Sequence, residues 1–140
     1  MSADIGKSVR TRLSKRSAVT NICGDSIFAG VRDQGSKLPA LVVQVTGNTP
    51  EQDLSGTNRI YPSIVTVLAY ADDRDKANEL ALQVRDDALP PDLYGRVEGM
   101  EWQEVTLQSG PVEIEQEPED GSDIWIRITS QEFVIWNAAV

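Results

Sequence analysis

The stretch RIYPSIVTVLAYADDRDKANELALQVRDDALPP, residues 59–91, decides the fold class of this chain. Its first part, 59–71, predicts a strand because β-branched and aromatic residues dominate it. The apolar side chains of this strand are, on one face, Val65, Val67 and Ala69 and, on the other, Ile64, Leu68 and Tyr70. Because both faces are apolar, we expect the strand to be central and covered on both sides, by helices or by another subunit. Pro62 lacks an N–H donor and is therefore expected at the start of the strand or at a sheet edge.

The second part of the stretch predicts the clearest helix of the chain. Asp72 or Asp73 can cap its N-terminus, where acidic side chains also suit the helix dipole. Small and aliphatic residues recur at three- and four-residue spacing and form one stripe: Ala77, Leu80, Ala81, Val84 and Ala88. Such a stripe lets the helix lie close to a sheet, and Pro90 and Pro91 end the helix.

The residues before this stretch predict one helix and two strands. Over residues 4–16, Ile5, Val9 and Leu13 form a narrow apolar stripe with helical spacing. A short strand is expected at 26–29, and a confident one at 40–46, behind Pro39. The polar segments 30–37 and 47–58 are predicted to be loops.

The residues after it predict two strands, 100–108 and 124–136, joined by a long acidic hairpin connection. The apolar residues of the last strand change face along its length. A β-bulge near Ser130 would reconcile them, as would a strand long enough to leave the sheet and meet another surface. We therefore expect a single α+β domain over 1–140, with its core at about 24–136. Its sheet should be mostly antiparallel, with four to five strands, and packed by two helices.

The charge of the chain is −9 and is unevenly spread. The first 16 residues sum to +4, through one aspartate and five cations: Lys7, Arg10, Arg12, Lys15 and Arg16. The remaining 124 residues sum to −13 and should repel nucleic acid. The basic helix face is either solvated or in contact with an acidic neighbouring subunit or DNA, and Arg10, Arg12 and Arg16 are the candidate contacts. The N-terminus lacks the apolar core of a secretory signal, so we expect folding in a cytoplasm.

Little in the sequence points to catalysis. There is no histidine, which excludes Ser-His and Cys-His nucleophile machinery, and Cys23 is the single cysteine. Asp72, Asp73 and Asp75 lack the glycine and glutamate of a calcium loop, so capping explains them better. Trp102, Trp125 and Trp136 lie in predicted strands without interleaved cations, as in a core or a subunit interface. We expect no catalytic residue, no cofactor and no metal.

The acidic connection leaves three interpretations open. Glu113, Glu115 and Glu117 alternate along an extended segment and so share one side of it. They can belong to a solvated hairpin, to a divalent-ion site, or to an acidic wall that keeps passing DNA from adhering inside a channel.

Three segments together resemble the tail completion, or tail terminator, family of tailed bacteriophages and prophages: GDSIFAGVRDQGSKLPALVVQ (24–44), LSGTNRIYPSIVTVLAYADDRDKANELALQVRDDAL (54–89) and DIWIRITSQEFVIW (123–136). The shared pattern includes a Gly-Asp-x-Ile-Phe turn, a loop with Gln34, a Leu-Pro step into a strand and a Leu-x-Gly loop. It closes with an apolar strand that ends in Tyr-Ala and an Ala-x-x-Leu-Ala helix.

The resemblance implies a virion subunit that forms a hexameric ring at the head-proximal end of the tail tube. The ring would stop tube polymerisation and dock the head connector, with genomic DNA passing through it. It would take its own copies, the tail tube protein and the connector protein as partners, and no membrane. In such a ring the loops 30–37 and 47–58 become contact arms, and the candidate contacts there are Gln34, Asp53, Leu54 and Arg59.

Three rival interpretations remain. A head-closure or stopper protein of the neck has similar size and context. A carboxylate enzyme with a metal would use Glu113 or Glu115. A cytosolic binding module would never form a ring.

Overall fold

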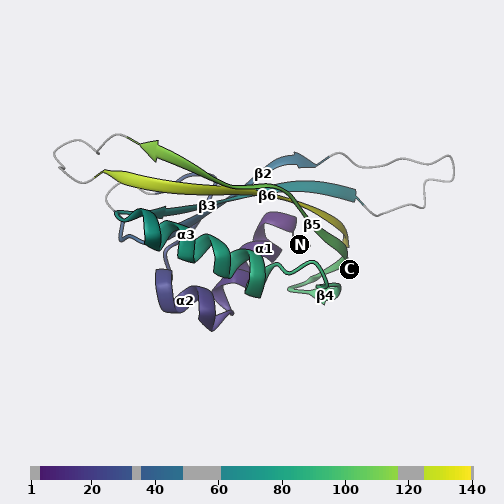
Figure 1. The fold of residues 1–140 in the computed structure, drawn as a ribbon. Coiled ribbons are helices and arrows are strands. Elements are labelled where there is room, and N and C mark those ends of the chain that lie inside the picture. The colour runs from purple at the N-terminus through teal and green to yellow at the C-terminus, as the bar shows by residue number, and fades with distance from the viewer. Residues whose placement is uncertain (1–3, 33–35, 49–60, 117–124, 140) are drawn as a thin grey trace, which may run out of the picture.

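The computed structural model describes residues 4–32, 36–48, 61–116 and 125–139. In these residues a layer of helices packs on one curled six-stranded sheet (Figure 1). The helices are α1 (Ile5–Ser14), α2 (Ser17–Cys23) and α3 (Arg74–Gln83), which runs into a π-helical turn, η1 (Val84–Ala88). The strands are β1 (Ile27–Ala29), β2 (Ala40–Asn48), β3 (Tyr61–Ala71), β4 (Gly95–Val97), β5 (Met100–Gln116) and β6 (Ile126–Ala139).

The strand order is β1-β2-β3-β6-β5-β4, and every pair is antiparallel except β1–β2. The α+β class and the mostly antiparallel sheet are thus confirmed. The expectation of four to five strands and two helices is wrong by one strand, β4, and one helix, α2. Both elements are short, three and seven residues, so neither shows a hydrophobic period. β4 exists because it pairs with the start of β5.

The central place of β3 is confirmed. It pairs with β2 on one side and with β6 on the other, and Pro62 is its second residue. Val65, Val67 and Ala69 are buried in the core that the helices cover, as expected. Ile64, Leu68 and Tyr70 lie on the opposite face, where they are half-buried and no described helix covers them.

α3 begins and ends near its predicted bounds. Asp73 caps it, accepting a hydrogen bond of 2.9 Å from the backbone N–H of Asp75. The predicted stripe is buried against the sheet, but its last turn is π-helical. Where the helix changes period, the carbonyl of Ala81 accepts a 2.8 Å hydrogen bond from the Gln131 side-chain amide of β6. The helix is therefore tied to the centre of the sheet by a buried polar contact.

The N-terminal helix is shorter than the predicted 4–16. Asp4 caps α1 through the backbone N–H of Lys7 at 2.7 Å, and the chain then turns into α2. On the sheet side of α1, Ser8 is fully buried beside the apolar stripe. Its hydroxyl donates to the Val97 carbonyl at 2.8 Å and accepts from the indole N–H of Trp102 at 3.2 Å. One serine thus joins α1 to both β4 and β5.

The acidic connection is largely strand, which corrects its interpretation as a hairpin loop from residue 109. β5 stays paired with β6 until Gln116, opposite Ile126. The predicted bulge near Ser130 is not in β6, whose pairing with β3 is continuous. The register shifts lie in β5 instead, between Trp102 and Glu104 and between Leu107 and Val112. Beyond β4, which pairs only with residues 100–102, no described strand covers the outer edge of β5.

None of the described helices has the length and apolar character that crossing a membrane requires.

We predict that Ser8→Ala destabilises the fold by about 1–3 kcal/mol, because the buried Trp102 N–H and Val97 carbonyl lose their partner. Urea unfolding followed by circular dichroism measures the change. Ser14→Ala is the matched control, since Ser14 lies exposed on the same helix and bonds only the Thr11 carbonyl among described residues. A Ser8→Ala variant as stable as Ser14→Ala would contradict the proposed tie.

We also predict that Gly110→Ala costs about 2 kcal/mol more than Gly95→Ala. Both glycines have a positive φ, 98° and 97°, so backbone strain cancels in the comparison. A Cβ on Gly110 would lie 2.5 Å from the backbone oxygen of Ser130, whereas one on Gly95 meets nothing within 4 Å. Thermal unfolding of the two variants at equal protein concentration measures the difference, and equal losses would refute the close approach of β5 to β6.

Candidate assembly surfaces

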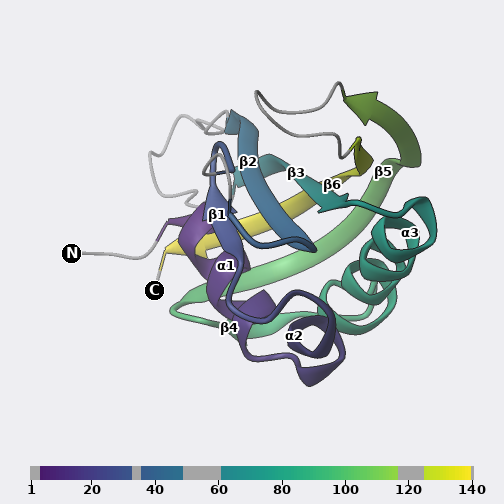
Figure 2. The same cartoon turned by 90° about the vertical axis from the view of Figure 1, so that its left-hand side faces the viewer.

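The sheet face away from the helices is the first candidate surface, and we call it the open face. The cross-strand register places these apolar residues on it: Phe28, Val42, Ile64, Leu68, Tyr70, Val112, Ile114, Ile126, Ile128, Val134 and Trp136. Val112 and Ile114 are 52% and 46% exposed, and most of the others are half-buried. Figure 2 shows the strongly curved β5, which carries this face from β4 to its far end beside α3.

Two acidic side chains lie among the apolar residues of the open face, one on β5 and one in the middle of β6. Glu104 pairs in register with Trp136, and Glu132 lies four residues before Trp136 on the same strand face. Their carboxylates accept hydrogen bonds from uncharged groups, Thr106 Oγ1 and Gln108 Nε2, each at 3.3 Å. Because these partners are neutral, the two negative charges are left uncompensated by any ion pair among the described residues.

The basic N-terminal segment is the second candidate surface. Its cations are of two kinds: some have partners within the subunit and some do not. Arg16 makes two hydrogen bonds of 2.9 Å to Asp87, and Arg12 donates to the Ala88 carbonyl at 2.9 Å. Arg12 therefore holds α1, and Arg16 holds the start of α2, against the π-helical turn within the subunit. Lys7 is exposed and Arg10 half-buried, and neither forms an ion pair in the described part of the chain.

The Arg16–Asp87 pair makes this packing pH-dependent. The hydrogen bonds from Arg16 lower the pKa of Asp87 below its ordinary value. Their stabilisation is therefore present above the unfolded-state pKa of Asp87 and is lost as the pH falls through the folded-state pKa. Both side chains are partly exposed, so the contribution is small.

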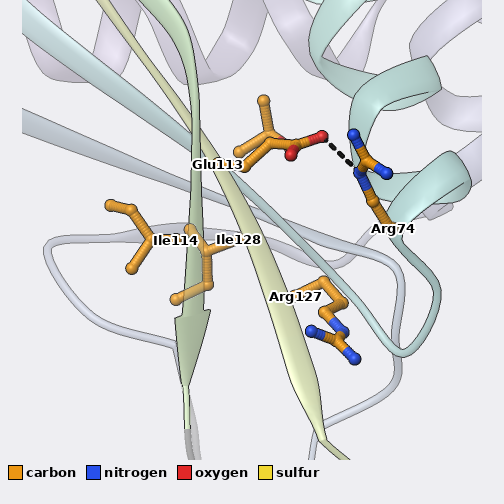
Figure 3. Close-up of a pocket in the computed structure, with 6 residues that line it drawn as sticks. Arg74, Glu113, Ile114, Arg127 and Ile128 are labelled. Atoms are coloured by element: carbon orange, nitrogen blue, oxygen red, sulfur yellow. Dashed lines mark hydrogen bonds and ion pairs between the residues drawn. The ribbon is translucent and has the colours of Figure 1, made fainter.

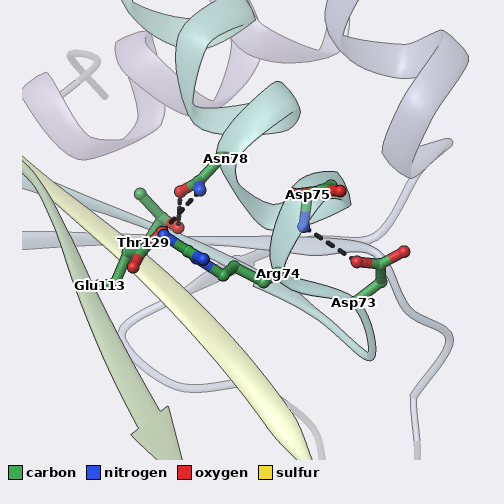
Figure 4. Close-up of polar contacts among 6 residues, drawn as sticks. All are labelled: Asp73, Arg74, Asp75, Asn78, Glu113 and Thr129. Carbon is green, nitrogen blue, oxygen red and sulfur yellow. Dashed lines mark hydrogen bonds and ion pairs between the residues drawn. The ribbon is translucent and has the colours of Figure 1, made fainter.

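The far end of β5 and β6 is the third candidate surface. Arg74 at the start of α3 bonds Glu113 of β5 at 2.7 Å, and the Asn78 amide bonds the same carboxylate oxygen at 2.7 Å (Figure 4). Thr129 of β6 donates to Asn78 Oδ1 at 2.7 Å. The hydrogen bond from Arg74 lowers the pKa of Glu113. This carboxylate is thus neutralised within the subunit.

A shallow cavity of about 220 Å³ lies beside this cluster, lined by Arg74, Glu113, Ile114, Arg127, Ile128 and Thr129. Figure 3 shows Ile114 and Ile128 on one side of the strands, with Glu113 turned toward Arg74. In the described residues, no three acidic or cysteine side chains are grouped as metal ligands. Cys23 is buried, and burial raises the pKa of its thiol to about 11, so it is a poor nucleophile.

The structure describes only some of the other candidate residues. Glu115 lies in β5, in register with Arg127. Gln34, Asp53, Leu54, Arg59 and Glu117 lie outside the described residues. The tryptophans separate: Trp102 is in the core, Trp136 is on the open face, and Trp125 is 45% exposed just before β6.

Two features escaped the sequence interpretation. The pairing of Arg74 with Glu113 joins residues 39 positions apart, and no local pattern signals it. The two apolar faces of β3 indicated an apolar surface on the side away from the helices. The extension of this surface over β5 and β6 could not be predicted, because the register between strands decides which residues share a face.

Comparison with known proteins now adds the family. No curated protein matches the sequence. A chain from a solved structure described as the virion of a native gene transfer agent (GTA) particle has the same fold, with a TM-score of 0.61. It shares 13% identity, and the alignment covers 96% of this chain and 95% of the other. The family model described as "Tail completion protein gp17" matches residues 7–108. The chain therefore belongs to the tail completion protein gp17 family, whose members are structural proteins of the phage tail rather than enzymes.

Proposed function

We propose that six copies of the chain form a ring that caps the head-proximal end of the tail tube. The ring ends tube polymerisation and joins the tail to the head connector, and genomic DNA passes through it. Its partners are its own copies, the tail tube protein and the connector protein. It assembles in the host cytoplasm and remains in the neck of the virion.

The observation that carries this proposal is the open face. An antiparallel sheet with one face in water ordinarily alternates apolar and polar residues, so that the water-facing side is polar. Here the water-facing side of β3 carries Ile64, Leu68 and Tyr70. Thr66 and Glu132 interrupt this face, but a largely apolar face toward water is typical of a protein–protein interface. In an assembly a neighbouring subunit would cover this face, as expected for a structural protein.

The proposed contact residues differ in whether they already have partners within the subunit. Arg10 is available for an acidic neighbour, whereas Arg12 and Arg16 already have partners inside the subunit. Gln34, Asp53, Leu54 and Arg59 belong to segments that we propose as contact arms. Glu113, Glu115 and Glu117 are proposed to line the DNA passage or its approach, although Glu113 can repel DNA there only weakly while Arg74 neutralises it.

We predict that the purified chain, mixed with tail tubes that lack it, occupies one end of each tube. Averaged electron micrographs should show a six-fold ring at that end, and tubes capped before elongation should stay short. The reason is that a ring closed on itself offers the tube one complementary surface.

Tailless heads are the control in this experiment. Binding to heads before tails would identify a head-closure protein instead. Decoration along the whole tube, or no association with tubes or heads, would contradict a role at the junction.

A further inference from the structure

We propose that the open face is the docking surface for a second copy of this chain, arranged head to tail. The exposed side of α1 of one copy then lies against Glu104 and Glu132 on the open face of the next. This inference rests on the proposed ring, and it names the two surfaces that build it.

The apolar part of the open face provides the area. Ile114 and Val112 protrude from β5, and Leu68 and Tyr70 continue the patch over β3. The guanidinium of Arg32 lies over the ring of Tyr70, 5.7 Å from its centre. An apolar surface that includes an aromatic residue is the usual centre of a protein interface.

Two carboxylates on this face select the partner. Glu132 lies within the patch, in register with Thr66, and Glu104 lies beside Trp136; both bond only neutral groups among the described residues. A partner that brings cations to these glutamates is therefore favoured, and a second acidic surface would be repelled.

α1 of the same chain offers those cations on the opposite side of the molecule. Ile5 and Val9 face the sheet, and Lys7, two residues from each, points away from it. Arg10 lies on the flank of the helix and is half-buried. The helices cover one face of the sheet (Figure 1). The register between strands places Glu104 and Glu132 on the other face.

The charge distribution of the whole chain favours the same arrangement. The first 16 residues sum to +4 and the remaining 124 to −13. Arg12, Lys15 and Arg16 bond partners within the subunit, so Lys7 and Arg10 are the cations of this segment that face a neighbour. Two copies packed open face to open face would place acidic residues against acidic residues. Two copies packed head to tail place the basic helix against an acidic body. Such a contact joins two different surfaces and so leads to a closed ring when the rotation between copies permits.

Charge reversal within one chain tests the arrangement. Glu104→Lys with Glu132→Lys should weaken self-association at least about tenfold, because it sets cations against cations. Lys7→Glu with Arg10→Glu should do the same from the other side. All four changes in one chain should restore assembly, since every head-to-tail contact is then complementary again. Sedimentation velocity over a concentration series measures each state.

A second pair of variants tests the apolar part. Ile114→Glu should dissociate the assembly, whereas Leu82→Glu on α3, off the open face, should not. The two leave similar fractions of side chain exposed in the subunit, 46% and 37%, so their effects on folding are comparable. Circular dichroism confirms that each variant is folded.

The outcomes separate this inference from the proposed function. If the fourfold reversal stays dissociated, or if the Glu104→Lys and Glu132→Lys pair strengthens association, the head-to-tail arrangement is wrong. If Ile114→Glu assembles normally, the open face is not the contact. If the charge-reversal variants behave as expected but rings never bind tube ends, the two contact surfaces are supported and the proposed tail-capping role is wrong.

Discussion

The structure depends on a mismatch between the sheet and the helices that cover it. β3 is apolar on both faces, yet the described helices all lie on one. The covered face is a closed core of aliphatic side chains around Trp102 and Phe133. The other face is left apolar toward solvent, which a stable soluble subunit tolerates only over a limited area. The proposed self-association of the subunit rests on this division of the sheet.

Polar ties keep the helical layer in place, and so keep the open face in one shape. Ser8 joins α1 to β4 and β5, Gln131 joins α3 to β6, and Arg12 joins α1 to the π-helical turn. The first two contacts are buried, where a lost partner costs more than the bond itself contributes. Because these ties connect distant parts of the sequence, they fix how the sheet curls under the helices. A surface recognised by its side chains needs such a fixed backbone.

The sequence predicts those helices and strands that are long enough to show a hydrophobic periodicity. β3 and α3 were predicted closely because apolar spacing, an aspartate cap and two prolines mark them. α2 and β4 are too short to show a period. The extension of β5 was not predicted, because the residues from 109 onward were assigned to the acidic connection; the structure has a register shift there, between Ser109 and Val112, after which the pairing with β6 continues. Among the candidate site residues, Arg12 and Arg16 looked like surface cations, and only the packing of α1 and the start of α2 on the π-helical turn reveals their internal partners.

The kinked outer edge of β5 has a consequence for how copies meet. A straight, unpaired strand invites any similar strand to extend the sheet through its main chain, and this leads to fibres without limit. Here the irregular spacing between Trp102 and Val112, and the missing N–H of Pro111, deprive an incoming strand of a regular row of partners. Main-chain pairing with another copy is therefore interrupted along this part of the edge, and contacts between side chains are favoured over an extended sheet.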